Sequence, residues 1–213
     1  MASDERSTST KERENFKILC LHGIGGNGDV PSLRYQLGDK YEFDFVDGAH
    51  PWPAAPGITQ AFGVQVCYSY YYDGTAASAL AAVDDLATYV VDNGPFDAVL
   101  GFSMGAALAA TLLLQPDERY AAARQMIPSA ALSLCLRQGK MGFLKAADQV
   151  RKEDRVAIPT VHAWSPQDTD QPGQSQQLIK IDRKDPCLPC THLVIEHRGR
   201  HGMSHCPVDV SNE

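Results

Sequence analysis

The sequence Val99-Leu100-Gly101-Phe102-Ser103-Met104-Gly105-Ala106 is an apolar run that passes into a Gly-x-Ser-x-Gly pattern. Residues 95–100 predict a buried strand and residues 104–114 a helix, so strand, tight turn and helix follow one another. A serine on such a turn has a strained backbone and an exposed hydroxyl, and the residues two before and two after it must be small. Both are glycines here, and we therefore predict that Ser103 is a catalytic nucleophile, with a plain strand-to-helix turn as the alternative.

The composition indicates one globular domain. The chain has 213 residues, of which 44% are hydrophobic, enough for a substantial core. We predict a disordered N-terminal tail over residues 1–15 and a single domain over residues 16–213.

Charge and targeting signals indicate the partners and the location to expect. The net charge is -7 and the sequence has no cluster of basic and aromatic residues, so we do not expect it to bind nucleic acid. The tail has no apolar core typical of a signal peptide, and no run reaches the roughly 18 apolar residues of a membrane span. We expect a cytoplasmic protein.

The chain has six cysteines, which could form disulfides or bind a metal ion. Without a secretory signal, free thiols are the expectation. Cys187-Leu-Pro-Cys190, followed by His192, has the spacing of half a zinc site, but only His205-Cys206 could supply a second pair. We interpret this stretch as an ordinary loop and expect no bound metal.

Strands and helices alternate along the chain. Besides the stretch around Ser103, strands are predicted over residues 16–22, 41–46, 130–135, 155–163 and 191–197, the last being the final strand. Helices are predicted over residues 31–37, 75–93, 139–151 and 174–181, with a short one beginning at Pro116. The alternation predicts an α/β fold with a mostly parallel sheet flanked by helices on both faces.

The first strand ends in a glycine-rich loop over residues 23–28. Its G-x-G-x-x-G pattern, with Asp47 at the end of the next strand, matches a dinucleotide-binding fingerprint. Pro31 starts the following helix only after the last glycine, whereas the fingerprint needs the helix to begin within the motif. Such a loop can instead lend the amide of Ile24 or Gly25 to an oxyanion hole. We favour the oxyanion loop and keep a nucleotide-dependent reductase and a structural turn as alternatives.

Residues 49–73 are a long segment rich in proline and aromatic side chains. Long connections in compact domains are usually functional or disordered, and the aromatic residues favour order. We interpret the segment as a lid or pocket wall for an apolar acyl chain, with surface packing as the alternative. The aromatic residues assigned to the pocket are Trp52, Tyr70, Tyr71 and Tyr72.

A nucleophilic serine needs a base and a group that orients the base. In hydrolases with this turn, an acid and then a histidine follow the serine, each after a later strand. Asp168 and His201 stand in that order, and we predict a triad of Ser103, Asp168 and His201. Asp170 lies in the same loop as Asp168 and is the alternative acid. The other histidines nearby lie in a strand or close to the terminus.

The chain resembles the small fungal serine hydrolases of the α/β-hydrolase fold, a group related to the human ovarian-cancer-associated hydrolase. The resemblance rests on residues 18–23, 45–48, 55–58, 101–105, 159–162 leading to Asp168, and 197–201. It covers roughly residues 16–201. It implies an esterase or thioesterase acting on a small-molecule ester or acyl thioester. Several members release or trim polyketide products, which implies an acyl carrier protein of a polyketide synthase as a partner.

The expected mechanism needs no metal or organic cofactor. Ser103 attacks the carbonyl carbon, and the amides of Met104 and of Ile24 or Gly25 bind the oxyanion. Water then releases the acid, or an internal nucleophile releases a lactone or another cyclised product. The sequence leaves these two outcomes open, because they differ in whether water reaches the acyl-enzyme.

Overall fold

The computed structural model describes residues 15–28, 40–72, 75–127, 131–134, 158–164, 192–197 and 208–211. Three predicted helices lie outside these ranges, over residues 31–37, 139–151 and 174–181, as does the predicted tail apart from Asn15. The cysteines of the Cys187-Leu-Pro-Cys190 stretch lie outside them too.

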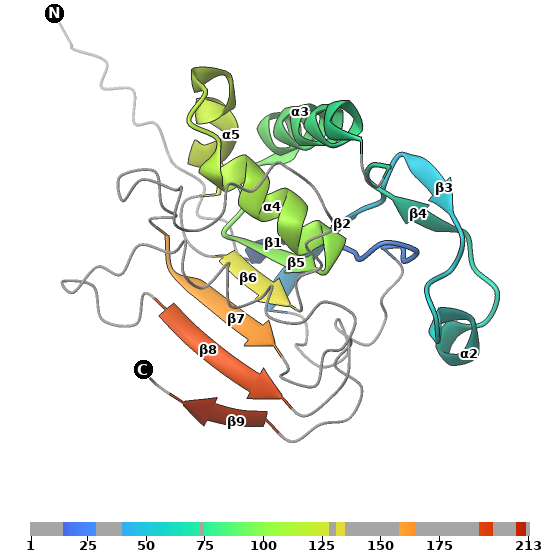
Figure 1. Ribbon diagram of the computed structural model, residues 1–213. Helices are drawn as coiled ribbons and strands as arrows, with labels where there is room; N and C mark the ends of the chain where they lie inside the picture. Colours follow the sequence, from blue (N-terminus) through green and yellow to red (C-terminus); the bar gives the residue numbers. More distant parts are fainter. Residues whose placement is uncertain are drawn as a thin grey trace, which may run out of the picture.

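The described strands form a seven-stranded sheet with the order β2-β1-β5-β6-β7-β8-β9 (Figure 1). The strands are β1 (Phe16–Leu21), β2 (Tyr41–Val46), β5 (Ala98–Phe102), β6 (Ala131–Leu134), β7 (Thr160–Trp164), β8 (His192–His197) and β9 (Val208–Ser211). All neighbours pair in parallel except β8 and β9. The predicted α/β class and mostly parallel sheet are confirmed.

Two strands begin later than predicted. β5 starts at Ala98 and not at Pro95, because the Phe96 amide donates to the carbonyl of Met126 (2.7 Å) instead of joining the ladder. β7 starts at Thr160, directly after Pro159, whose nitrogen has no hydrogen to donate. At their carboxyl ends the strands run slightly further than predicted, β5 to Phe102 and β7 to Trp164.

The prediction that residues 191–197 form the last strand is wrong. Val208–Ser211 adds a further strand, antiparallel to β8, with His197 opposite Val208. Its alternation covers only four residues, too few for a periodicity to stand out from the surrounding polar sequence.

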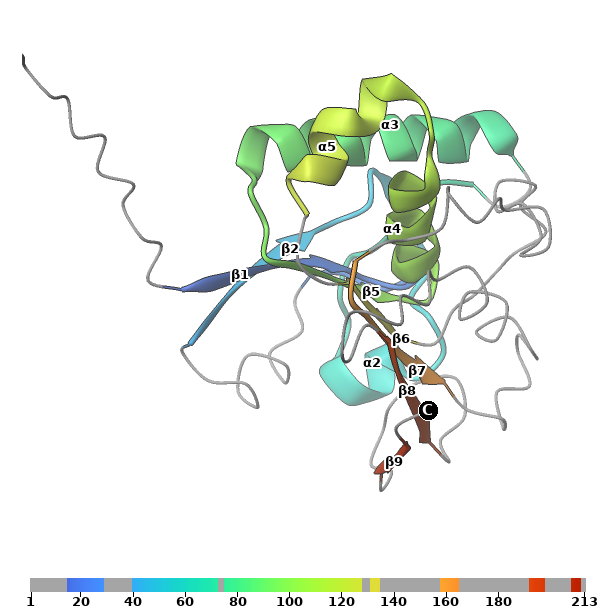
Figure 2. The same cartoon turned by 90° about the vertical axis from the view of Figure 1, so that its left-hand side faces the viewer.

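Apart from the short helix α2, described below, the helices of the described part lie together over one face of the sheet (Figure 2). They are α3 (Ala76–Asn93), α4 (Met104–Leu114), the 3-10 helix η1 (Glu118–Tyr120) and α5 (Ala121–Gln125). Every residue of α4 from Met104 to Leu112 is buried, so its uniformly apolar sequence suits a helix covered on all sides. The core forms where α4 and α3 pack on the strands, with Leu19, Val99, Val83 and Leu112 almost inaccessible. None of these helices is long and apolar enough to cross a bilayer.

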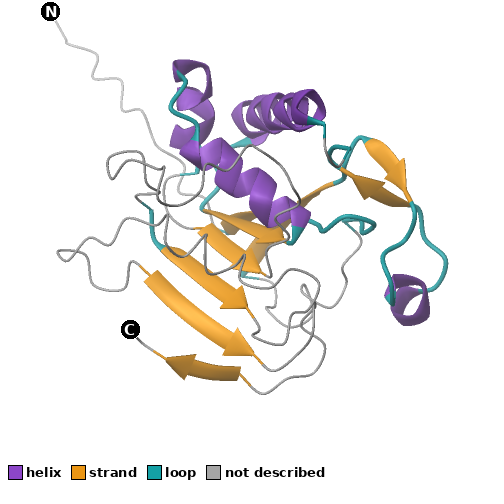
Figure 3. Cartoon of the chain, viewed as in Figure 1, coloured by secondary structure: helices purple, strands orange, loops and turns teal. Residues whose placement is uncertain are grey.

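Residues 50–69 form an ordered ribbon that projects beside the main sheet (Figures 1 and 3). Its strands β3 (His50–Trp52) and β4 (Cys67–Ser69) pair antiparallel, and the short helix α2 (Ile58–Phe62) lies between them. No residue of α2 is buried, and glycines with positive φ stand at both of its ends, Gly57 (88°) and Gly63 (78°). The expected order of this segment is confirmed, although the pairing of β3 with β4 was not predicted.

Candidate functional site

Ser103 lies at the sharp turn between β5 and α4. Its backbone has φ 50° and ψ -113°, and it is the one non-glycine residue with positive φ in the described part of the chain. Such conformations are strained and cluster at functional sites. A Cβ on Gly101 would lie 2.5 Å from Ala106 Cα, and one on Gly105 would lie 2.4 Å from the carbonyl oxygen of Leu21. The predicted need for small residues on both sides of Ser103 is therefore met by close backbone approach.

The glycine-rich loop covers Ser103. A Cβ on Gly23 would lie 3.2 Å from Ser103 Cβ and 2.8 Å from the ring of Phe102, and the Gly105 amide donates to the carbonyl of His22 (3.1 Å). Ser103 is accordingly only 2% exposed, although an exposed hydroxyl was expected. The loop and the turn around Ser103 thus form two sides of one small site.

Two backbone amides suit the predicted oxyanion hole. Met104 is the first residue of α4, where an amide has no acceptor within the helix. On the loop, the Gly25 amide donates to the carbonyl of Tyr68 (2.9 Å) and is occupied. The Ile24 amide has no hydrogen-bond acceptor among the described residues. Of the two loop candidates, the contacts favour Ile24.

The same contacts argue against a nucleotide-binding loop. A pyrophosphate is bound by free backbone amides at a helix N-terminus. The Gly26 amide donates to the carbonyl of Gly23 (3.0 Å), and the Gly28 amide donates to the carboxylate of Asp47 (2.6 Å). With Gly25 bonded to Tyr68, three amides of the motif already have partners, and the Asp47 carboxylate would repel a phosphate.

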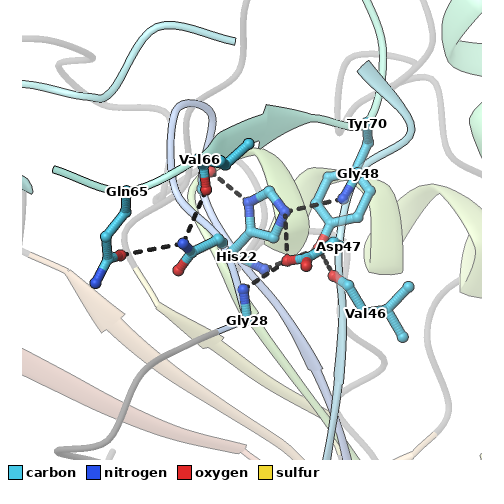
Figure 4. A network of polar contacts seen from close by, with 10 residues as sticks. His22, Gly28, Val46, Asp47, Gly48, Gln65, Val66 and Tyr70 are labelled. Atoms are coloured by element: carbon cyan, nitrogen blue, oxygen red, sulfur yellow. Dashed lines mark hydrogen bonds and ion pairs between the residues drawn. The ribbon is translucent and has the colours of Figure 1, made fainter. Parts of the chain in front are cut away.

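His22 joins this loop to the rest of the molecule through a buried polar network (Figure 4). Its Nδ1 lies 2.7 Å from the carbonyl oxygen of Gly23, and its Nε2 lies 3.0 Å from the amide nitrogen of Gly48. An amide can only donate and a carbonyl can only accept, so the ring carries its hydrogen on Nδ1 and is neutral. The Tyr70 hydroxyl accepts from the His22 amide (2.9 Å) and donates to the carbonyl of Val46 (2.7 Å).

Burial sets the ionisation of this network. It lowers the pKa of His22 below its usual value, against smaller opposing effects of the Gly23 carbonyl and of Asp47. Burial likewise raises the pKa of the Tyr70 hydroxyl. Both side chains are therefore uncharged at neutral pH. Sequence reasoning did not assign a role to His22, and the only signal for one was its place in the Leu-His-Gly stretch beside a predicted oxyanion loop.

The four predicted pocket residues fall into two groups. Tyr70 and Tyr71 are core residues, 7% and 2% exposed, and the hydroxyl and ring of Tyr70 are engaged by the His22 network. Trp52 and Tyr72 lie near each other at the surface, with ring centroids 6.0 Å apart, and Tyr72 is 49% exposed. Only Trp52 and Tyr72 have the accessibility that contact with an acyl chain needs.

Asp168, its alternative Asp170 and His201 lie outside the described residues. The strands that precede them, β7 and β8, run parallel to β5 and end at the same edge of the sheet as β5, which leads into Ser103. Residues in register across β5, β6, β7 and β8 form the row Phe102, Leu134, Ala163 and Ile195. His197 is the last residue of β8 and is paired with Val208, which agrees with choosing a later histidine as the base.

Known proteins resemble this chain in sequence and in fold. A family model described as "Serine hydrolase (FSH1)" matches residues 10–204. Esterase FPY3 of Fusarium mangiferae is 32% identical over 214 residues, which cover 93% of each chain. A Bacillus cereus carboxylesterase superposes with a TM-score of 0.59 at 15% identity, covering 89% of this chain and 82% of its own. Zea mays acyl-protein thioesterase 2 gives 0.58 at 17%, covering 91% and 89%. The expected α/β-hydrolase fold is confirmed.

Proposed function

This chain belongs to the serine hydrolase (FSH1) family, and we propose that it cleaves a small-molecule ester or thioester through an acyl-enzyme on Ser103. The observation that carries the proposal is the strained backbone of Ser103 between β5 and α4, with the Gly23 loop packed against it. Strain of this kind costs free energy, and it persists where the surrounding structure holds a group in position for chemistry.

The catalytic base and its partner are proposed to be His201 and Asp168, with Asp170 as the alternative acid. Neighbouring strands are about 4.8 Å apart, so the end of β7 lies about 10 Å from the end of β5 and the end of β8 about 14 Å. Asp168 comes four residues after Trp164, the last residue of β7, and His201 comes four after His197, the last residue of β8. An extended chain spans about 3.3 Å per residue, or about 13 Å over four residues, and the side chains add to this reach, so both loops are long enough to reach Ser103.

The proposed reaction has two steps with one proton carrier. Ser103 Oγ attacks the carbonyl carbon while His201 accepts its proton, and the amides of Ile24 and Met104 stabilise the oxyanion. The tetrahedral intermediate collapses, and His201 returns the proton to the leaving alcohol or thiol. A water, deprotonated by His201, then attacks the acyl-enzyme, and the acid leaves as Ser103 regains its hydrogen.

We further propose a polyketide or similar acyl thioester on a carrier protein as the substrate, as the resemblance to the fungal family implies. The 50–69 ribbon would then serve as lid or pocket wall, with Trp52 and Tyr72 touching the acyl chain. In support, the ribbon is attached to the oxyanion loop itself by two hydrogen bonds between Gly26 and Gly25 on one side and Tyr68 on the other. The pocket wall and the oxyanion donor would therefore be positioned together.

The nucleophile is tested by intact-mass measurement after treatment with a fluorophosphonate probe. We expect one adduct on the wild-type protein and none on Ser103→Ala, since the probe reacts with an activated serine hydroxyl. Equal labelling of the variant would contradict the assignment.

The substrate class is tested with p-nitrophenyl esters and N-acetylcysteamine thioesters of rising chain length. A preference for the acetyl substrates alone would contradict a long acyl chain. Mass spectrometry of the product separates hydrolysis from cyclisation.

A further inference from the structure

We infer that His22 is a positioning residue of the oxyanion hole: its neutral ring fixes the Gly23–Ile24 peptide so that the Ile24 amide faces the substrate carbonyl oxygen. The inference rests on the proposed function, because it concerns the same acyl-transfer site. It assigns to His22 no contact with substrate and no proton transfer.

The orientation of the Gly23–Ile24 peptide is set by its carbonyl oxygen. That oxygen accepts two hydrogen bonds, from Nδ1 of His22 (2.7 Å) and from the amide of Gly26 (3.0 Å). In a planar trans peptide the N–H points opposite to the C=O, so fixing the Gly23 oxygen fixes the direction of the Ile24 hydrogen. Two donors on the carbonyl also polarise the peptide, which makes the Ile24 amide a stronger donor.

Besides the hydrogen bond from Nδ1 to Gly23, two further contacts hold the His22 ring. Its Nε2 accepts from the Gly48 amide (3.0 Å), and its ring stacks on Tyr70 with the centroids 4.6 Å apart (Figure 4). A Cβ on Gly48 would lie 2.4 Å from the backbone of Ser69, so Gly48 is pressed against β4 and its amide has little freedom. The ring therefore connects the oxyanion loop to the segments that directly follow β2 and β4.

These contacts exclude His22 as the catalytic base in the described arrangement. Nδ1 donates to Gly23 and Nε2 accepts from Gly48, so both nitrogens are occupied. The Asp47 carboxylate oxygen lies 3.9 Å from Nε2, but Nε2 carries no hydrogen to donate to it. The contribution of the ring to the site is the hydrogen bond that Nδ1 donates to the Gly23 carbonyl oxygen.

Two substitutions of His22 by an amide side chain test separately the hydrogen bond that the ring donates to Gly23 and the one that it accepts from Gly48. In His22→Asn the side-chain NH2 lies near the position of Nδ1 and can still donate to Gly23. In His22→Gln the side-chain amide reaches the position of Nε2 and can accept from Gly48 but not donate to Gly23. We expect kcat of His22→Gln to fall about 10- to 100-fold with KM within about threefold, since removing one oxyanion donor outright costs about 100- to 1,000-fold. We expect kcat of His22→Asn within about fivefold of wild type.

The outcomes distinguish this inference from a purely structural role. Equal kcat for the two variants, or a lower kcat for His22→Asn, would overturn it. Tyr120→Phe is the control, because it removes a part-buried hydrogen bond of a buried tyrosine, to Asp84 (2.6 Å), away from the loop. It should lower stability and leave kcat unchanged, and a loss of kcat there equal to that of His22→Gln would also overturn the inference.

Two further measurements keep the test decisive. Fluorophosphonate labelling of the wild type tests the proposed function alone, so a labelled wild type with a fully active His22→Gln contradicts only the inference about His22. Nitrogen-15 NMR of the wild-type imidazole at neutral pH needs no variant to fold. It should show the neutral form with hydrogen on Nδ1, and either the Nε2–H form or the imidazolium would overturn the inference.

Discussion

The turn at Ser103 and the loop from His22 to Gly28 are two sides of one site, and different forces hold them. Close packing holds the turn, since neither Gly101 nor Gly105 has room for a Cβ. Hydrogen bonds hold the loop, and most of its partners come from distant residues such as Tyr68 and Gly48. The two glycines that permit the close packing lie within five consecutive residues, whereas the hydrogen bonds of the loop depend on partners spread over residues 47–70. Mutations should therefore affect the two sides differently.

The largest loss of stability should come from a mutation in the closely packed turn at Ser103. Gly105→Ala places a Cβ 2.4 Å from the Leu21 carbonyl oxygen, and backbone cannot move aside as a side chain can. We expect a loss of about 3 kcal/mol or more in the free energy of unfolding, measured by urea denaturation. Gly57→Ala is the control for an added Cβ without a clash: unlike Gly105, Gly57 has a positive φ (88°), but it has open space around it, and the substitution should cost only about 1 kcal/mol. Equal stability of the two variants would contradict the packing account.

The next largest loss of stability should come from a mutation in the hydrogen-bond network that holds the loop from His22 to Gly28. Tyr70→Phe keeps the ring but leaves the His22 amide and the Val46 carbonyl without the hydroxyl they share. Buried groups left unpaired cost about 1–3 kcal/mol, and we expect a loss in that range by urea denaturation. A variant as stable as the wild type would show that water replaces the hydroxyl and that the network contributes little to folding.

A smaller effect should reveal the strain at Ser103. Glycine adopts positive φ freely and alanine does not, so Ser103→Gly should be about 1 kcal/mol more stable than Ser103→Ala. At an ordinary position the order is reversed, because glycine gains more entropy on unfolding. Both variants should be inactive, so thermal or urea unfolding is the measurement. If Ser103→Ala proves the more stable, the turn is not strained.

The smallest effect should be the pH dependence contributed by His22. Burial lowers its pKa in the folded protein, so the unfolded chain binds a proton first as the pH falls. The stability contributed by the neutral ring is complete above the unfolded pKa of about 6.5 and is lost as the pH falls through the folded pKa. The difference in urea midpoint between wild type and His22→Asn should shrink from pH 7.5 to pH 5. A difference that grows on acidification would contradict the buried neutral ring.

The packing side of the site could be predicted from the sequence, and the hydrogen-bonded side only in part. The Gly-x-Ser-x-Gly pattern is local, and it predicted the start of α4 and the need for two glycines, whereas β5 ends at Phe102, two residues beyond the predicted strand. The loop was assigned to the oxyanion hole, but the choice between Ile24 and Gly25 depended on Tyr68, more than 40 residues away. Likewise Tyr70 reads as one of several clustered tyrosines, and only the fold shows its ring against His22.

Three short strands were also not predicted, because they too depend on contacts between segments that are apart in the sequence. Strand β9 is four residues long and gains its place from pairing with β8, which no local pattern encodes. The β3 and β4 segments pair across fourteen intervening residues, and each has only three residues in its ladder. Long apolar elements such as α3, by contrast, were predicted nearly to the residue.

A crystal structure of the protein after reaction with the fluorophosphonate tests the proposed site most directly. We expect phosphorus bonded to Ser103 Oγ, a phosphonyl oxygen within about 3 Å of the amide nitrogens of both Ile24 and Met104, and Ser103 still at positive φ. Phosphorus on another residue, or a phosphonyl oxygen turned away from both amides, would contradict it.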